Sequence, residues 1–180
     1  MTKIVLVGGN GYIGREITKQ WLKRDSDIQI YVTSRSGRQE IKDERVHHIQ
    51  VDVENYEEFE KSIPSDIDYI VSLIYGNMEG LKTIRKFSEK HGIKAIGNIN
   101  AVANAPGFEE FVAMKNNELD FLKESSVRVA NYDLTIAYGS DRDDDLANAI
   151  RAGYMDAVHP VRVEIVACSL IDELLKSWLA

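Results

Sequence analysis

A glycine-rich turn close to the N-terminus constrains the fold of this chain more than any other sequence feature. Residues 8–14 read Gly-Gly-Asn-Gly-Tyr-Ile-Gly. The turn follows a short apolar run at 3–8 and precedes an amphipathic segment at 12–24. This order predicts a buried parallel strand, a tight turn and a helix. We include Asn10, inside the turn, among the predicted ligand-binding residues.

Each of the three regularly spaced glycines has a predicted role. We expect Gly8 to end the strand in a tight turn, Gly11 to let a pyrophosphate approach the backbone, and Gly14 to let the helix pack closely on the strand. The free N–H groups of Tyr12 and Ile13 then face the phosphates, aided by the helix dipole. The strand–turn–helix context therefore predicts a dinucleotide site, with a purely structural turn as the alternative.

Strand-like and helix-like segments alternate along the rest of the chain. Further strands are expected at 28–33, 46–51, 67–74, 93–99, 132–138 and 161–167. Further helices are expected at 55–62, 80–91, 108–125 and 170–179. Such alternation requires right-handed crossovers and a mostly parallel sheet, so the sequence predicts one α/β domain of three layers over residues 1–180.

Two segments near the C-terminus have alternative interpretations. The acidic stretch 139–147 is expected to be a solvated loop, and no metal site is predicted because no cluster of ligating side chains has a suitable spacing. The apolar stripe of the last helix is broad. We expect it to pack on the sheet, and a homodimer interface is the alternative.

Composition excludes some classes of partner. The net charge of −7 argues against nucleic acid, whose binding depends on phosphate neutralisation by Lys and Arg. The single cysteine, Cys168, allows no intrachain disulfide, which fits a reducing compartment. No signal peptide and no apolar stretch of membrane-spanning length is apparent, so we expect a cytoplasmic protein without a membrane partner.

The end of the second expected strand indicates which nucleotide is preferred. Enzymes specific for NAD usually place an acidic residue there to bind the ribose 2′-hydroxyl. Here the strand ends in Ser34 and Arg35, with Arg38 close behind and no acid at the diagnostic position. Arginine side chains bind a 2′-phosphate well. The sequence therefore favours NADP(H) over NAD(H), with a solvated basic loop as the alternative.

The GxxGxxG spacing of the turn resembles that of the extended and atypical short-chain dehydrogenase/reductases. The small single-domain NAD(P)H-binding proteins of that superfamily are the most similar, including relatives of flavin and biliverdin reductases and of nitrogen-metabolite-repression regulators. The resemblance covers most of the chain and is strongest at residues 3–35. It implies a Rossmann-type, doubly wound sheet in the order 3-2-1-4-5-6-7. It also implies cofactor contacts on the adenosine side from Asp52, Val53, Leu73 and Ile74.

This sequence differs from the family at the catalytic residues. The usual set is Ser, Tyr and Lys, with Tyr and Lys spaced YxxxK on the helix after strand five. Lys115 matches the lysine and is expected to contact the cofactor ribose, with an ordinary surface lysine as the alternative. The tyrosine position is then Phe111, which has no proton to give, and the serine is replaced within Asn98–Ala101. No catalytic residue is therefore assigned, and alcohol–ketone chemistry is not expected.

Two functions remain open from the sequence, and a third is less favoured. Only 41 residues follow Gly139, so a minimal substrate region after 139 is expected to form a shallow pocket. A flat small-molecule acceptor such as a flavin or quinone suits such a pocket, which favours an NAD(P)H-dependent oxidoreductase that uses NADPH. The alternative is a non-catalytic NADP(H)-binding redox sensor. An isomerase or epimerase with a permanently bound cofactor is disfavoured by the missing tyrosine.

Overall fold

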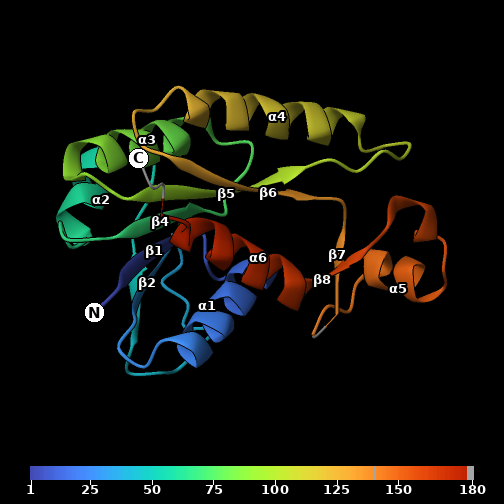
Figure 1. The fold of residues 1–180 in the computed structure, drawn as a ribbon, viewed down its shortest axis with the longest axis horizontal. Helices are drawn as coiled ribbons and strands as arrows, with labels where there is room; N and C mark the ends of the chain where they lie inside the picture. The colour runs from blue at the N-terminus through green and yellow to red at the C-terminus, as the bar shows by residue number, and fades with distance from the viewer. Residues whose placement is uncertain (140, 178–180) are drawn as a thin grey trace.

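A parallel sheet of six strands forms the centre of the molecule (Figure 1). The computed structural model describes residues 1–139 and 141–177. The strands are β1 (Lys3–Val7), β2 (Gln29–Ser34), β3 (Val46–Gln50), β4 (Tyr69–Ser72), β5 (Ala95–Ala101) and β6 (Val129–Leu134). Their order in the sheet is β3-β2-β1-β4-β5-β6, which confirms the predicted order for these six strands.

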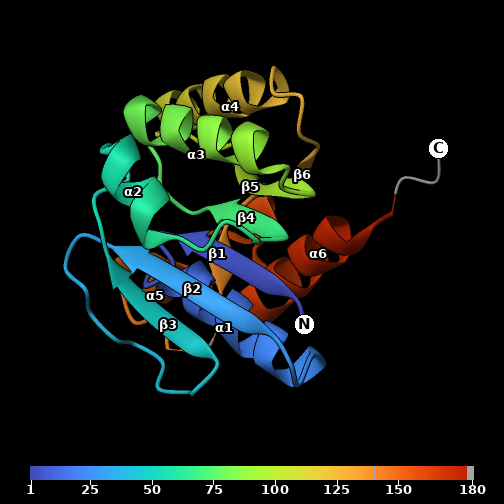
Figure 2. The same cartoon turned by 90° about the vertical axis from the view of Figure 1, so that its left-hand side faces the viewer.

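Helices cover both faces of the sheet and complete the three predicted layers (Figure 2). One face carries α1 (Tyr12–Arg24) and α6 (Val163–Leu175), and the other carries α2 (Tyr56–Ser62), α3 (Met78–His91) and α4 (Glu109–Lys123). The architecture is therefore the predicted Rossmann-type α/β fold. No helix in the described part of the chain is both long and apolar enough to cross a membrane.

The apolar run of β1 explains why the sheet needs helices on both faces. Ile4 and Leu6 belong to the core cluster on the side of α1 and α6. Val5 and Val7 belong to the cluster on the side of α2 and α3. All four side chains are at most 1% exposed. Because both faces of β1 are buried, its residues do not alternate between apolar and polar, and its sequence is continuously apolar.

The segment 161–167 is not the predicted seventh strand of the main sheet. Only β8 (Val161–Arg162) is extended, and it pairs with β7 (Ala137–Tyr138) in a separate two-stranded sheet. From Val163 onward the chain is helical, in α6. Its buried residues recur at helical spacing: Val163, Val166, Ala167, Leu170, Ile171 and Leu174. A short β-branched run does not by itself distinguish a strand from a buried helix, and here the helical period extends beyond it.

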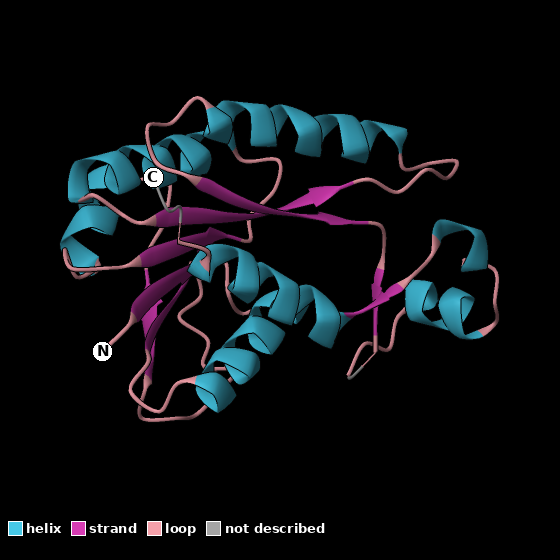
Figure 3. Cartoon of the chain, viewed as in Figure 1, coloured by secondary structure: helices cyan, strands magenta, loops and turns pink. Residues whose placement is uncertain are grey.

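A small lobe extends beyond the carboxyl ends of the strands (Figure 3). It contains β7, β8, α5 (Asp145–Arg151) and the 3-10 turn Asp156–Val158. A small apolar cluster lies beneath it, in which Ala103, Ile136 and Val158 are buried. The predicted strand at 132–138 is divided between β6 and β7, and the predicted loop at 139–147 gives way to α5 at its end. Trp178 and Leu179, predicted in the last helix, lie outside the described residues.

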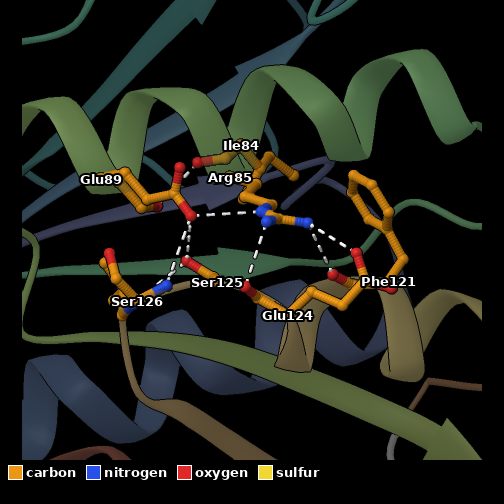
Figure 4. Close-up of polar contacts among 9 residues, drawn as sticks. Ile84, Arg85, Glu89, Phe121, Glu124, Ser125 and Ser126 are labelled. Carbon is orange, nitrogen blue, oxygen red and sulfur yellow. Dashed lines mark hydrogen bonds and ion pairs between the residues drawn. The ribbon is translucent and has the colours of Figure 1, made fainter.

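Arg85 on α3 fixes the C-terminal end of α4 (Figure 4). Its guanidinium donates to the carbonyl oxygens of Phe121, at 3.3 Å, and Glu124, at 3.0 Å. It also forms ion pairs with the carboxylates of Glu89 and Glu124, both at 3.1 Å. Carbonyls at a helix C-terminus lack intrahelical donors, so a cation from a neighbouring helix stabilises this end. Because α4 carries Phe111 and Lys115, this contact helps to hold part of the candidate site in place.

Candidate functional site

A pocket of about 600 Å³ lies at the carboxyl ends of β1, β4, β5 and β6. In open α/β sheets this is the edge where ligands bind. The glycine turn, the loop after β4, one face of α4 and the small lobe all line it. Eight of the predicted site residues are among the lining residues: Gly8, Gly11, Tyr12, Ile13, Gly14, Leu73, Ile74 and Lys115.

A second hollow, of about 760 Å³, lies at the opposite edge of the sheet. It is lined by residues that precede β5 and β6, such as Lys94 and Arg128, and by the end of α6. None of the predicted site residues lines it. Location at the carboxyl ends of the strands, rather than volume, therefore identifies the candidate site.

Three different structural reasons explain the glycines of the turn. Gly8 has a φ of +77°, in the left-handed region that favours glycine. A Cβ on Gly14 would lie 2.4 Å from the Gly9 carbonyl oxygen, so Gly14 permits close packing of α1 against the turn. A Cβ on Gly9 would lie 2.7 Å from the Leu6 Cβ, a constraint that the sequence spacing does not reveal. A Cβ on Gly11 would meet only the Gly8 oxygen, at 3.8 Å, so the space beside Gly11 is open.

The start of α1 has the properties of an anion-binding site. Among the described residues no side chain caps this terminus, whose N-cap residue is Gly11. The first N–H groups of a helix have no intrahelical acceptor, and the helix dipole favours negative charge there. Beside it, the buried Oδ1 of Asn10 has no hydrogen-bond partner in the described structure. The uncapped terminus and the open space at Gly11 fit a pyrophosphate.

We expect Gly11→Val to abolish dinucleotide binding while the fold survives. The backbone of Gly11 has a φ of −69°, which a branched residue adopts without strain, and its side chain would enter the open space. Titration with NADPH should detect no binding, and the melting temperature should stay close to that of the unmodified chain. Normal binding by the folded variant would show that the turn is only structural.

The residues predicted to select the nucleotide lie beside the pocket rather than in its lining. Ser34 Oγ accepts a hydrogen bond from the Gly37 N–H at 3.1 Å, which shapes the loop after β2. The Asn10 side chain donates to the Arg38 carbonyl at 2.8 Å and ties this loop to the glycine turn. The Arg38 guanidinium is paired with Glu40. Arg35 is exposed, and its guanidinium has no partner among the described residues.

The four residues implied to contact the adenosine side occupy different environments. Leu73 and Ile74 lie directly against Gly8, where a Cβ would come within 3.1 Å of Ile74 Cγ2. Val53 is 8% exposed and belongs to the core between the sheet and α3. Asp52 is exposed, and its Oδ1 accepts from the Glu54 N–H at 3.0 Å, which shapes the turn before α2. The structure thus brings two of the four to the glycine turn.

Lys115 is buried, so it is not the ordinary surface lysine of the alternative interpretation. Its Nζ lies 2.9 Å from Glu118 Oε2, and the two side chains are 8% and 3% exposed. Glu118 Oε1 also accepts from the Gly76 N–H at 2.6 Å, in the loop between β4 and α3. Glu118 was not predicted as a site residue, although its spacing of three from Lys115 places both on one face of α4. The carboxylate neutralises the Lys115 charge and links α4 to the loop.

The pocket wall presents Phe111, which has no proton to donate, at the position matched to the catalytic tyrosine. Phe111 is 40% exposed and contacts the ring of Tyr75 edge to face, with 5.6 Å between ring centroids. Asn100 and Ser72 also line the pocket, and Asn100 Oδ1 and Ser72 Oγ are buried without a described hydrogen-bond partner. The described residues include no group of three or more His, Cys, Asp or Glu that could hold a metal ion.

Gly139 and Arg142, after β7, lie against the start of α1, while Asp141, Asp143 and Asp144 are exposed, as predicted for an acidic loop. The Tyr12 hydroxyl donates to the Gly139 carbonyl at 2.6 Å. Burial raises the pKa of Tyr12 to about 12, so the hydroxyl stays protonated for this bond. The Arg142 guanidinium lies over the Tyr12 ring at 5.5 Å and donates to the Ala137 carbonyl at 3.0 Å. Asp141, Arg142 and Asp144 therefore become part of the pocket wall.

The fold is shared with several solved structures at low sequence identity. The Bordetella bronchiseptica enzyme WbmH, in complex with NAD+, has a TM-score of 0.76 and 13% identity over 97% of this chain and 72% of its own. A short-chain dehydrogenase/reductase from Veillonella parvula, in complex with NADP, has a TM-score of 0.73 and 17% identity over 96% of this chain and 87% of its own. UDP-glucose 4-epimerase from Thermotoga maritima has a TM-score of 0.74 and 15% identity over 98% of this chain and 74% of its own.

Sequence comparison identifies the family to which this chain belongs. A segment of 74 residues, 41% of this chain, is 36% identical to the uncharacterized protein YtbQ of Bacillus subtilis and spans only 26% of that relative. The NAD(P)H-binding family profile matches residues 8–152, which is most of the chain and includes the glycine turn and the pocket. The predicted resemblance is confirmed for NAD(P)H binding and for the fold: the chain belongs to the NAD(P)H-binding family, and it shares the fold of a short-chain dehydrogenase/reductase.

Proposed function

We propose that this chain is an oxidoreductase that uses NADPH to reduce a flat acceptor such as a flavin or quinone. The observation that carries the proposal is that one pocket joins the glycine turn to an apolar surface at Phe108 and Phe111, where residue 111 is not a tyrosine. The nicotinamide, when bound, supplies the hydride. A flavin or quinone accepts hydride and can take its proton from water, so it needs no protein acid beside it.

The residues of the chain act by binding and orientation. The N–H groups at the start of α1 and the open space at Gly11 hold the pyrophosphate. Lys115, neutralised by Glu118, adds a hydrogen-bond donor to the wall of the pocket without adding a net charge. The apolar surface around Phe111 and Phe108 excludes water from one side of the acceptor. Such a site accelerates hydride transfer by bringing donor and acceptor together.

Measuring NADPH oxidation with added acceptor tests this function. NADPH absorbance is followed with riboflavin, FMN and menadione over a range of acceptor concentrations. We expect a rate that saturates with acceptor and is lost in Gly11→Val. Binding of NADPH without oxidation in the presence of any of these acceptors would contradict the reductase and favour the redox sensor.

We further propose that the chain prefers NADPH to NADH through Arg35. Its guanidinium is exposed and unpartnered among the described residues, whereas that of Arg38 is paired with Glu40. A hydrogen bond to a charged group contributes about 1.5–3 kcal/mol, which corresponds to roughly 10- to 100-fold in affinity. Arg35→Ala should weaken NADPH binding by that factor and leave NADH binding unchanged.

A matched control separates this effect from a general loss of positive charge. Arg24, at the far end of α1, pairs with Asp172 and lies away from the pocket. Arg24→Ala removes the same charge and should leave both affinities unchanged in calorimetric titrations. Equal loss for NADPH and NADH in Arg35→Ala, or no loss at all, would contradict the proposed role of Arg35.

A further inference from the structure

We propose that Tyr75 and Phe111 form a binding platform for an uncharged aromatic ring of the acceptor. In this proposal Glu118 positions the two residues of the platform. This inference deepens the proposed function and rests on it, because it assigns the acceptor's place in the same pocket. Tyr75 comes from the loop between β4 and α3, and Phe111 from the first turns of α4. Both line the pocket that contains the glycine turn.

The exposure of the two rings is the first reason for the proposal. The Tyr75 side chain is 66% exposed and that of Phe111 is 40% exposed, although the two rings contact each other. Their planes meet at 80°, so the pair presents a ring face and a ring edge together. Aromatic side chains usually bury most of their surface, and a contiguous exposed pair at a pocket mouth indicates a surface that a ligand covers.

The second reason is that buried contacts fix the platform from behind. Phe111, Lys115 and Glu118 follow one another at spacings of four and three on α4, so they share one face of the helix. Glu118 is 2% exposed, and its carboxylate bonds both Lys115 Nζ and the Gly76 N–H. Gly76 directly follows Tyr75. One buried carboxylate therefore holds together the helix that carries Phe111 and the loop that carries Tyr75.

The chemistry of the surrounding wall indicates the class of ligand. The side chains that line the pocket beside the platform include Ala103, Phe108, Ile136 and Leu146, which are apolar. The positive charge of Lys115 is neutralised by Glu118. A sugar ring placed against these apolar side chains would leave the hydroxyl groups on that side without partners, at a cost in affinity. An isoalloxazine or quinone ring instead gains stacking and apolar contact.

Binding of riboflavin, measured by quenching of its own fluorescence, tests the platform without turnover. Stacking of a planar base on an aromatic side chain changes affinity by about tenfold when the side chain is truncated to alanine. We expect Tyr75→Ala to weaken riboflavin binding by about tenfold and Tyr75→Phe to bind as the unmodified chain does. The control Tyr154→Ala removes a ring that is 83% exposed outside the pocket and should have no effect.

Three outcomes would overturn the platform. One is unchanged riboflavin affinity in Tyr75→Ala. Another is that Tyr75→Phe loses as much riboflavin affinity as Tyr75→Ala, which would assign the role to the hydroxyl. The third is no binding of riboflavin by the unmodified chain. NADPH titration is recorded in parallel: if NADPH does not bind, the proposed function fails while riboflavin quenching still reports on the platform. If NADPH is oxidised by riboflavin but Tyr75→Ala changes neither Kd nor KM, only the platform fails.

Rescue by a conservative variant tests the positioning role of Glu118. Glu118→Ala removes the acceptor of the Gly76 N–H and should raise the KM for riboflavin several-fold, with a smaller change in kcat. Glu118→Gln retains an oxygen that accepts from Gly76 but leaves the charge of Lys115 unpaired, so it should reverse part of the rise in KM. Both variants are assayed after circular dichroism has shown that they are folded. Equal KM values in Glu118→Ala and the unmodified chain, or failure of Glu118→Gln to restore KM in part, would contradict this role.

Discussion

Gly14→Ala is expected to destabilise the fold strongly, although alanine ordinarily favours a helix over glycine. The added Cβ would lie 2.4 Å from the Gly9 carbonyl oxygen and 2.7 Å from two other backbone atoms of Gly9. Backbone atoms cannot rotate away as a flexible side chain can, so α1 or the turn must shift. Overpacking of this kind costs about 1–3 kcal/mol or more, and we expect the upper part of that range in urea unfolding at pH 7.

Gly11→Ala is the matched control for this prediction. It lies in the same turn, and its added Cβ would meet only one atom, at 3.8 Å. Its free energy of unfolding should lie within about 0.5 kcal/mol of that of the unmodified chain, as for most substitutions away from packed sites. If Gly14→Ala proves as stable as Gly11→Ala, the close approach of α1 to the turn is not as described.

Lys115→Ala should lower the free energy of unfolding by about 3–5 kcal/mol, because it leaves the buried Glu118 carboxylate without its cation. From the sequence, Lys115 was expected to contact the cofactor ribose. Its burial in an ion pair adds an effect on stability that is independent of any ligand. Chemical unfolding without NADPH measures it directly.

A double variant distinguishes loss of the ion pair from loss of packing. Lys115→Met with Glu118→Leu replaces both charges by apolar side chains of similar length, and such replacements are often neutral or stabilising. We expect it to be clearly more stable than Lys115→Ala, although the Gly76 N–H loses its acceptor. A double variant as unstable as the single one would show that the charges themselves are not responsible.

The central part of the fold could be predicted from the sequence because local patterns and chain connectivity agree there. The apolar run of β1, the glycine turn and the amphipathic α1 define a strand–turn–helix unit. Right-handed crossovers then limit the order of the following strands. The segment 161–167 was assigned wrongly because β-branched residues occur in strands and in buried helices alike. The helical period becomes clear only when Leu170, Ile171 and Leu174 are included.

The candidate site could be predicted only where local sequence determines it. The turn residues follow one another, so their spacing was sufficient. Glu118 was missed because its burial and its contact with Gly76, on a different element, arise only in the folded chain, although Lys115 lies three positions earlier on the same helix. Arg142 was missed for a similar reason: it lies in an acidic segment, and its contact with Tyr12 joins residues 130 positions apart.

Calorimetric titration of the unmodified chain with NADPH tests the central claim, that the pocket at the glycine turn binds a nicotinamide dinucleotide. We expect saturable binding at one site per chain, and competition by NADP+ should reduce the heat. The absence of saturable binding of NADPH, and of NADH in the same experiment, to a chain shown to be folded would contradict that claim.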